Sequence, residues 1–161
     1  MSATKYTIPH IILHWAIAAL VTVQLLLADR MSAAFDQMME NITPAGAWTS
    51  SAVVHAVLGV AIGLLMVWRL MLSLTTETPP PARTGAVQTL SRATHGLFYV
   101  LLIGMPFAGA LAWFIPSQSL GNLHSFAGNF LIALILLHIG AALYHHYIAG
   151  EKTILRRMFP R

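Results

Sequence analysis

Residues 124–149 read HSFAGNFLIALILLHIGAALYHHYIA, an apolar run that begins with a histidine and carries three more. The run has no Asp, Glu, Lys or Arg. It exceeds the roughly 20 residues that a helix needs to cross the hydrocarbon core of a bilayer. An imidazole is costly to leave unpaired in lipid, so a histidine at membrane depth is by default a candidate functional residue. His124 and His138 are therefore candidate ligands of a buried group.

Three further stretches have a similar length and composition, at residues 8–28, 51–74 and 93–115. Together with residues 124–149 they predict an all-α protein, an integral membrane bundle of four transmembrane helices. The length fits a single domain over residues 1–161. The predicted connections are residues 29–49, 75–92 and 116–122.

Prolines mark three places along these spans. Pro9 lies in the first turn of the first span, where its missing N–H costs nothing. Pro106 is expected to bend the third helix, which membrane helices tolerate. Pro79, Pro80 and Pro81 are expected to force an extended exit from the second helix.

The composition excludes several classes of protein and of site. The chain is 57% hydrophobic and only 9% charged, whereas soluble domains carry about a quarter charged residues. It has no cysteine, which excludes disulfides, iron–sulfur clusters, thiolate zinc sites and covalently attached c-type haem. A haem held by histidines alone is compatible with this composition.

The positive charges predict the orientation, because Lys and Arg gather on the cytoplasmic side of bacterial membrane proteins. Only Arg30 falls in the first connection, among Asp29, Asp36 and Glu40. Both termini are therefore expected in the cytoplasm, and the basic balance reflects topology, not nucleic-acid binding. The first span is longer than a signal core, so cleavage is not expected. The other eight basic residues are Lys5, Arg69, Arg83, Arg92, Lys152, Arg156, Arg157 and Arg161.

Two histidines are predicted to lie near the outer surface, each followed four residues later by glycine. Gly59 follows His55, and Gly128 follows His124. Positions four apart share one face of a helix, so each glycine leaves a flat hollow beside an imidazole that a porphyrin edge fits. The alternative is that these glycines only let helices approach closely. The spacing favours His55 and His124 as a pair of ligands.

A second pair is predicted towards the cytoplasm. His138 lies fourteen residues after His124, about 21 Å along the helix axis and on nearly the same face. One helix can therefore hold two groups at different depths. By depth His138 pairs with His14. His145, seven residues after His138, is the alternative partner for His14.

The remaining candidates are assigned to the membrane surface or to the rim of a site. His95 is interpreted as a propionate or quinone contact, or as an ordinary interfacial histidine, because bulky Tyr99 follows one turn later. Arg69 is a candidate partner for haem propionates, and Arg92 is either that or a surface residue. His10 and His146 are assigned to the interface.

At this point the chain resembles the bacterial cytochrome b561 family over nearly its whole length. The resemblance depends on the ensemble, since no single motif is specific. Its motifs are YTIPHIILHW at residues 6–15, His55, VWRL at residues 67–70, Pro79-Pro80, THG at residues 94–96, Pro106, His124, His138, HHY at residues 145–147 and the stretch 153–160.

The resemblance implies a multi-pass protein of the inner membrane that holds two b haems and exchanges electrons with ubiquinone. His14 with His138, and His55 with His124, are then the axial ligands of the two irons. One branch similar to this family oxidises superoxide and reduces ubiquinone, which makes an oxidoreductase one expectation. The alternatives are an electron-transfer subunit for a partner dehydrogenase or other redox protein, and a non-redox membrane scaffold or metal carrier. The oligomeric state and the electron donor do not follow from the sequence.

Overall fold

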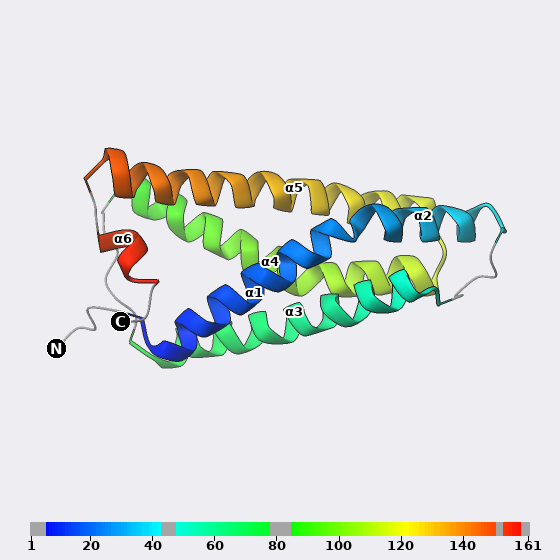
Figure 1. The fold of residues 1–161 in the computed structure, drawn as a ribbon, viewed down its shortest axis with the longest axis horizontal. Coiled ribbons are helices and arrows are strands. Elements are labelled where there is room, and N and C mark those ends of the chain that lie inside the picture. Colours follow the sequence, from blue (N-terminus) through cyan, green and yellow to red (C-terminus); the bar gives the residue numbers. More distant parts are fainter. Residues whose placement is uncertain (1–5, 43–47, 78–84, 151–152, 159–161) are drawn as a thin grey trace.

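The computed structural model describes residues 6–42, 48–77, 85–150 and 153–158, and within them it contains helices and no strand. Four helices are long and apolar enough to cross a membrane. The predicted class, an all-α membrane bundle, is thereby confirmed (Figure 1). The helices are α1 (Ile8–Leu26), α2 (Ala28–Met39), α3 (Ser50–Thr75), α4 (Ala86–Phe114), α5 (Gln118–Leu143), the π-helical turn η1 (Tyr144–Ile148) and α6 (Thr153–Arg156).

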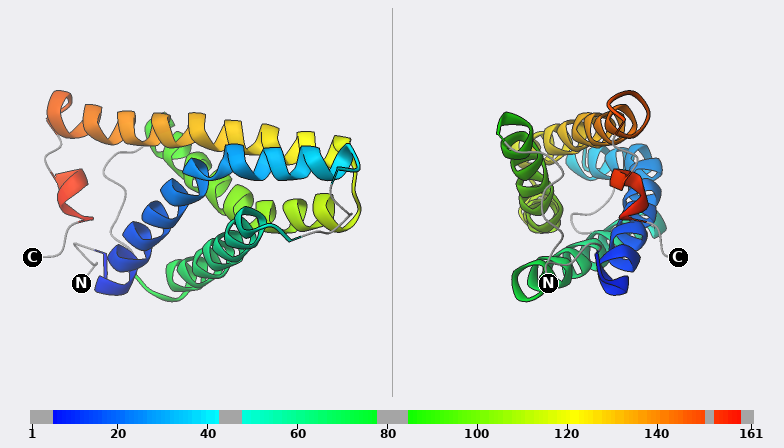
Figure 2. Two further views of the ribbon diagram at one scale, coloured as in Figure 1. Left: turned by 45° about the vertical axis from the view of Figure 1, so that its right-hand side comes forward. Right: turned by 90° about the vertical axis from the view of Figure 1, so that its left-hand side faces the viewer.

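The four long helices surround a common interior. α3 packs between α1 and α4, and α4 packs against α5 (Figure 2, right). α5 is not closely packed against α1 or α3 along the backbone. Large apolar side chains such as Leu64, Val100 and Phe107 cover the outside of the bundle, where lipid replaces water as the solvent.

The two ends of the bundle differ in charge. α2 lies at one end, and the beginning of α1 lies with α6 at the other (Figure 1); we call these the α2 end and the α6 end. α2 carries Arg30 with Asp29 and Asp36, and Glu40 follows as its C-cap. The described basic residues Arg69, Arg92, Arg156 and Arg157 belong to segments at the α6 end. Lys5, Arg83, Lys152 and Arg161, and the prolines 79–81, lie outside the described residues.

An apolar layer fills the middle of the bundle. All four long helices contribute to it, and Leu131 on α5 lies seven residues from both His124 and His138. On α5 this layer lies between the two depths at which those histidines lie, and its buried members are apolar. Its buried members are Leu13, Ile17, Val21, Ile62, Met66, Leu102 and Leu131.

The first connection contains a helix that the sequence analysis did not predict. α1 ends at Leu26 and the chain turns at Leu27 into α2, whose Ala34 and Met38 are buried. Met38 packs with Ala52 of α3 and Trp113 of α4, and Phe35 lies against Gly121 of α5. α2 therefore covers the end of the bundle, and residues 29–49 are not simply a loop.

Two helices begin earlier than the apolar pattern suggested. α4 begins at Ala86 instead of residue 93, directly after Gly85, whose φ of +71° suits glycine. α5 begins at Gln118 instead of residue 124, and the side chain of Gln118 donates to Asn122 Oδ1 at 3.1 Å. These first turns are polar, so hydrophobicity alone did not reveal them. As a result His124 lies well inside α5.

Pro106 lies within α4, which stays helical from Ala86 to Phe114 and changes direction near its middle (Figure 1). The proline faces a glycine of the neighbouring helix: a Cβ on Gly63 would lie 3.3 Å from Pro106 Cγ. α3 and α4 therefore approach closely at this point. Pro9 occupies the first turn of α1, as predicted.

The packing of α2 on α5 gives a stability prediction. A Cβ on Gly121 would lie 2.5 Å from the ring of Phe35, so Gly121→Val is expected to displace α2 and to lower the free energy of unfolding by about 1–3 kcal/mol. Gly104→Val is the matched control, because no atom lies within 4 Å of its Cβ position. Thermal unfolding in detergent is the measurement, and Phe35→Ala in the Gly121→Val background should recover part of the loss. Equal unfolding temperatures for the two glycine variants would contradict this packing.

Candidate functional site

Two histidines from opposite helices meet towards the α2 end. His55 lies in the second turn of α3 and His124 lies in α5, and their ring centroids are 6.1 Å apart with the rings inclined by 67°. Because α3 and α5 are not closely packed along the backbone, the two side chains span the interior to reach each other. The structure therefore brings together the two histidines that the glycine pattern singled out.

A second pair meets towards the α6 end. The rings of His14 on α1 and His138 on α5 have centroids 6.3 Å apart and are inclined by 57°. His145, the alternative to His138, lies in the π-helical turn η1, where its ring is 5.6 Å from that of Tyr144. By ring contact the structure therefore selects His138 as the neighbour of His14.

The spacing within both pairs suits a metal ion held axially between two imidazoles. A metal–imidazole bond is about 2.0 Å long and the ring centroid lies about 1.1 Å behind its nitrogen, so two coaxial ligands have centroids about 6 Å apart. The observed separations are 6.1 and 6.3 Å. Within the described residues there is no group of three or more His, Asp or Glu side chains that could hold a metal ion alone. A two-histidine site completed by a macrocycle fits these residues, and a four-ligand zinc site does not.

Flexible side chains occupy the hollows beside the two glycines of the α2-end pair. A Cβ on Gly59 would lie 3.5 Å from Gln24 Nε2, and one on Gly128 would lie 3.8 Å from Met105 Cε. The hollows predicted from the sequence are therefore filled, by two unbranched side chains with several rotatable bonds. The closest approach to an imidazole is at Gly109 of α4, where a Cβ would lie 3.0 Å from His124 Cε1.

Several buried polar atoms at this depth have no hydrogen-bond partner. They are the Nδ1 atoms of His55 and His124 and the Oε1 atom of Gln24. Gln24 donates through Nε2 to the backbone oxygen of His55 at 2.9 Å, which ties α1 to α3. Unsatisfied buried polar groups are rare in folded proteins and mark places where a ligand, ion or water belongs.

The α6-end pair has two polar neighbours. The ring of His95 lies 5.5 Å from that of His138, and its Nδ1 donates to Ser91 O at 2.7 Å, since a carbonyl can only accept. A neutral His95 therefore keeps Nε2 as an acceptor. Arg69 donates through Nη1 to Tyr99 Oη at 3.4 Å, and its Nε is buried without a partner.

His10 and His146 are the two histidines that the sequence analysis assigned to the interface. His10 is only 2% exposed, and its Nδ1 is 2.8 Å from Thr7 Oγ1, so it is buried by the protein at this end of α1, and its depth in the membrane stays a prediction. The end of the chain covers this region: Trp15 Nε1 donates to Met158 O at 2.7 Å. His146 is half-buried beside Tyr147, with ring centroids 4.7 Å apart.

The sequence analysis missed Gln24, Met105 and Gly109. Gln24 had a usable signal, because it is a polar residue inside an apolar span. Met105 and Gly109 had none, because Met and Gly are common in membrane helices and only the crossing of α4 with α5 places them beside the histidines.

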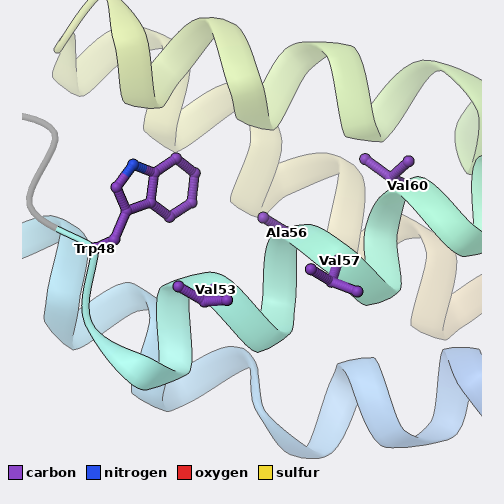
Figure 3. Close-up of a pocket in the computed structure, with 5 residues that line it drawn as sticks. All are labelled: Trp48, Val53, Ala56, Val57 and Val60. Atoms are coloured by element: carbon purple, nitrogen blue, oxygen red, sulfur yellow. The ribbon is translucent and has the colours of Figure 1, made fainter.

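A shallow apolar hollow lies on the outer side of α3, away from the histidine pairs. Figure 3 shows its five lining residues, with the indole of Trp48 at one end of the row. Three of them, Val53, Val57 and Val60, are between 42% and 62% exposed. This face is suited to a lipid chain, as expected for a protein surrounded by membrane lipid.

Four membrane-spanning helices with paired interior histidines are the arrangement of a membrane b-type cytochrome. The sequence matches the family described as "Prokaryotic cytochrome b561" over residues 5–161, and the chain belongs to this family. It is 31% identical to "Cytochrome b562" of Cereibacter sphaeroides over 156 residues, which cover 97% of this chain and 96% of that protein.

Two further relatives have names that bear on activity. "Probable superoxide oxidase CybB" of Yersinia pestis is 25% identical over 177 residues, covering 96% of each chain. "Cytochrome b561 homolog 1" of Escherichia coli K12 is 31% identical over 104 residues, covering 52% of this chain and 57% of that protein.

The family assignment carries three consequences for this chain. It is a multi-pass protein of the bacterial inner membrane. It binds haem b, for which two-histidine coordination without cysteine is suited. Its role is electron transfer in the membrane, and the reading as a non-redox scaffold or metal carrier is set aside.

Proposed function

We propose that this protein carries electrons across the inner membrane through two b haems, between ubiquinone and a redox partner on the opposite side. The observation that carries the proposal is the presence of two histidine pairs at two depths, with ring centroids 6.1 and 6.3 Å apart. His55 with His124, and His14 with His138, are the proposed axial ligands. Haem, when bound, supplies reversible one-electron chemistry.

The ligand type restricts that chemistry. Each proposed pair would supply two imidazoles to one iron, and a haem held in this way would transfer electrons without binding O₂. The apolar layer around Leu131 excludes water between the two depths. The residues at the α2 end therefore serve one haem and those at the α6 end the other, with about 21 Å between His124 and His138 along α5.

The proposed haem sites use the polar groups that lack partners. Arg69 carries a buried Nε that has no acceptor, and a propionate carboxylate at the α6 end would supply one. The hollows at Gly59 and Gly128 can admit a porphyrin edge if Gln24 and Met105 change rotamer. The α6 end is the proposed cytoplasmic side because the described basic residues gather there.

Ubiquinone is proposed to bind at the α6 end, near His95. The Nε2 atom of a neutral His95 is an acceptor beside His138, and it suits a hydroxyl of the reduced quinone. Two superoxide anions that each lose one electron become two O₂, and ubiquinone takes up both electrons with two protons. The relative named as a superoxide oxidase supports superoxide as the donor.

The charge of the α2 end favours the second candidate, an electron-transfer subunit that serves a partner redox protein. α2 and its C-cap Glu40 carry three carboxylates against Arg30, and a negative surface repels an anion. A protein donor with a basic surface would instead be attracted. The two candidates differ in whether the purified protein alone reacts with superoxide.

The ligand assignment predicts which histidines share a haem. His55→Ala and His124→Ala are each expected to remove the same one of two haems, and His14→Ala and His138→Ala the other, because an iron that loses one axial imidazole is bound weakly. Haem content per chain and redox titration of the visible spectrum are the measurements. His145→Ala is the control and should keep both haems. If His145→Ala removed a haem while His14→Ala kept both, the assignment at the α6 end would fail.

Gly109 gives a prediction that does not alter a ligand. Gly109→Val is expected to push the His124 ring aside, because even a Cβ would lie 3.0 Å from it, and so to weaken binding of the α2-end haem. Gly140→Val, whose Cβ position has no atom within 4 Å, is the matched control. Haem content and the spectrum of the bound haem distinguish the two variants. Full, unchanged occupancy in Gly109→Val would contradict the placement of His124 as a ligand.

Superoxide chemistry is tested with the purified protein in detergent, a superoxide source and a soluble ubiquinone. If the protein is an oxidase, ubiquinone is reduced without a further protein, and the rate should rise with ionic strength because salt screens the repulsion from α2. A heat-unfolded sample is the control. No quinone reduction by haem-replete protein would leave the subunit role as the function.

A further inference from the structure

Trp113 is a buried donor that no residue described by the structure satisfies. Its side chain is 4% exposed, and its Nε1 has no hydrogen-bond partner. An indole N–H can only donate, and a buried Trp usually finds an acceptor for it. Leaving such a group unpaired costs stability, so its retention at a buried position points to an acceptor that binds there.

The apolar side chains packed around Trp113 offer no acceptor. It packs with Met38 and Ala52, with Met31 and Phe35 around them, and none of these side chains has an oxygen atom. Its other ring neighbour is Trp48, at a centroid distance of 5.6 Å, which is also only a donor.

The position of Trp113 relates it to the α2-end histidine pair. It lies four residues after Gly109, the position on α4 against which the ring of His124 packs, and so on the same helix face about 6 Å further along the axis. Its neighbour Ala52 lies three residues before His55 on α3. Two helices therefore place the indole one turn from the histidine pair, between that pair and α2.

We infer that the indole N–H of Trp113 donates a hydrogen bond to a propionate carboxylate of the haem held between His55 and His124. This inference rests on the proposed di-haem function. A haem held by two imidazoles has carboxylates as its only strong acceptors, and a hydrogen bond to a charged acceptor is about twice as strong as a neutral one. The carboxylates of the chain in this segment belong to α2 and its C-cap. The buried face of α2 is apolar, so these carboxylates are not on the face that packs toward the indole.

The bond has a consequence for the redox behaviour of that haem. A propionate whose charge is offset by a donor stabilises the oxidised, more positive iron less than a bare carboxylate does. Trp113→Phe keeps an aromatic ring and removes the N–H, so it should favour the oxidised haem about fivefold, which is about 40 mV in midpoint potential at 59 mV per tenfold. The bare carboxylate also binds its proton more readily, so the fall of the potential with rising pH should move to higher pH in the variant.

The test is a redox titration of the visible spectrum of Trp113→Phe over a range of pH. The α2-end haem is expected to shift and the α6-end haem to stay unchanged in the same molecule. Trp48→Phe is the matched control, since it removes an indole N–H from the neighbouring, half-exposed side chain. If Trp113→Phe retains both haems with the potentials of the unaltered protein, the inference is wrong and the di-haem function stands. If the unaltered protein itself holds a single haem, the di-haem function is wrong.

A second measurement covers the case in which Trp113→Phe does not retain haem. The unaltered protein, grown with tryptophan labelled with ¹⁵N in the indole ring, is compared with unlabelled protein by infrared difference spectroscopy on haem reduction. Labelled Trp48→Phe, Trp15→Phe and Trp68→Phe proteins are the controls. A band that moves with the label in the unaltered protein and is still present in all three controls is assigned to the N–H of Trp113. No label-sensitive band from Trp113 would overturn the inference.

Discussion

An imidazole nitrogen inside a bilayer has no water to bond with, and this constraint organises the whole bundle. His55 with His124, and His14 with His138, reach across an interior that the helix backbones leave comparatively wide on the side of α5. Ordinary helix packing would bring small residues together there, as it does at Gly63 and Pro106. The bundle is instead built around side chains that meet at about the spacing of two ligands on one metal ion.

The same constraint explains why buried polar groups without partners gather at two depths with a buried apolar cluster between them. The middle of the bundle is a layer of Leu, Ile, Val and Met side chains from all four long helices. At either depth the chain leaves donors and acceptors without partners, among them Arg69 Nε, Gln24 Oε1 and Trp113 Nε1. Two sites with unmet hydrogen bonds, separated by an apolar layer, suit an electron carrier, because electrons cross such a layer while water and protons do not.

The two ends differ in ways that bear on partners. α2 closes one end with an apolar face on the bundle and carboxylates among its remaining residues, and it covers the region next to His55 and His124. The other end is basic and carries His95 beside His138 and the chain terminus tied to Trp15. The end that is proposed to meet the donor is thus acidic, which favours a basic protein donor over an anion.

The sequence by itself determined the four spans and the fold class. Length and hydrophobicity are local properties of a segment, and they decide whether a helix can span the hydrocarbon core. It also determined that His124 and His138 share a face of one helix, since fourteen residues return to nearly the same direction. Only the tertiary structure decided that the ring of His138 lies beside that of His14, and that His124 packs on Gly109. It alone revealed α2, whose polar sequence gives no span signal, and the unpaired Trp113 beneath it. These features depend on how helices cross, and crossing is set by contacts between residues far apart in the chain.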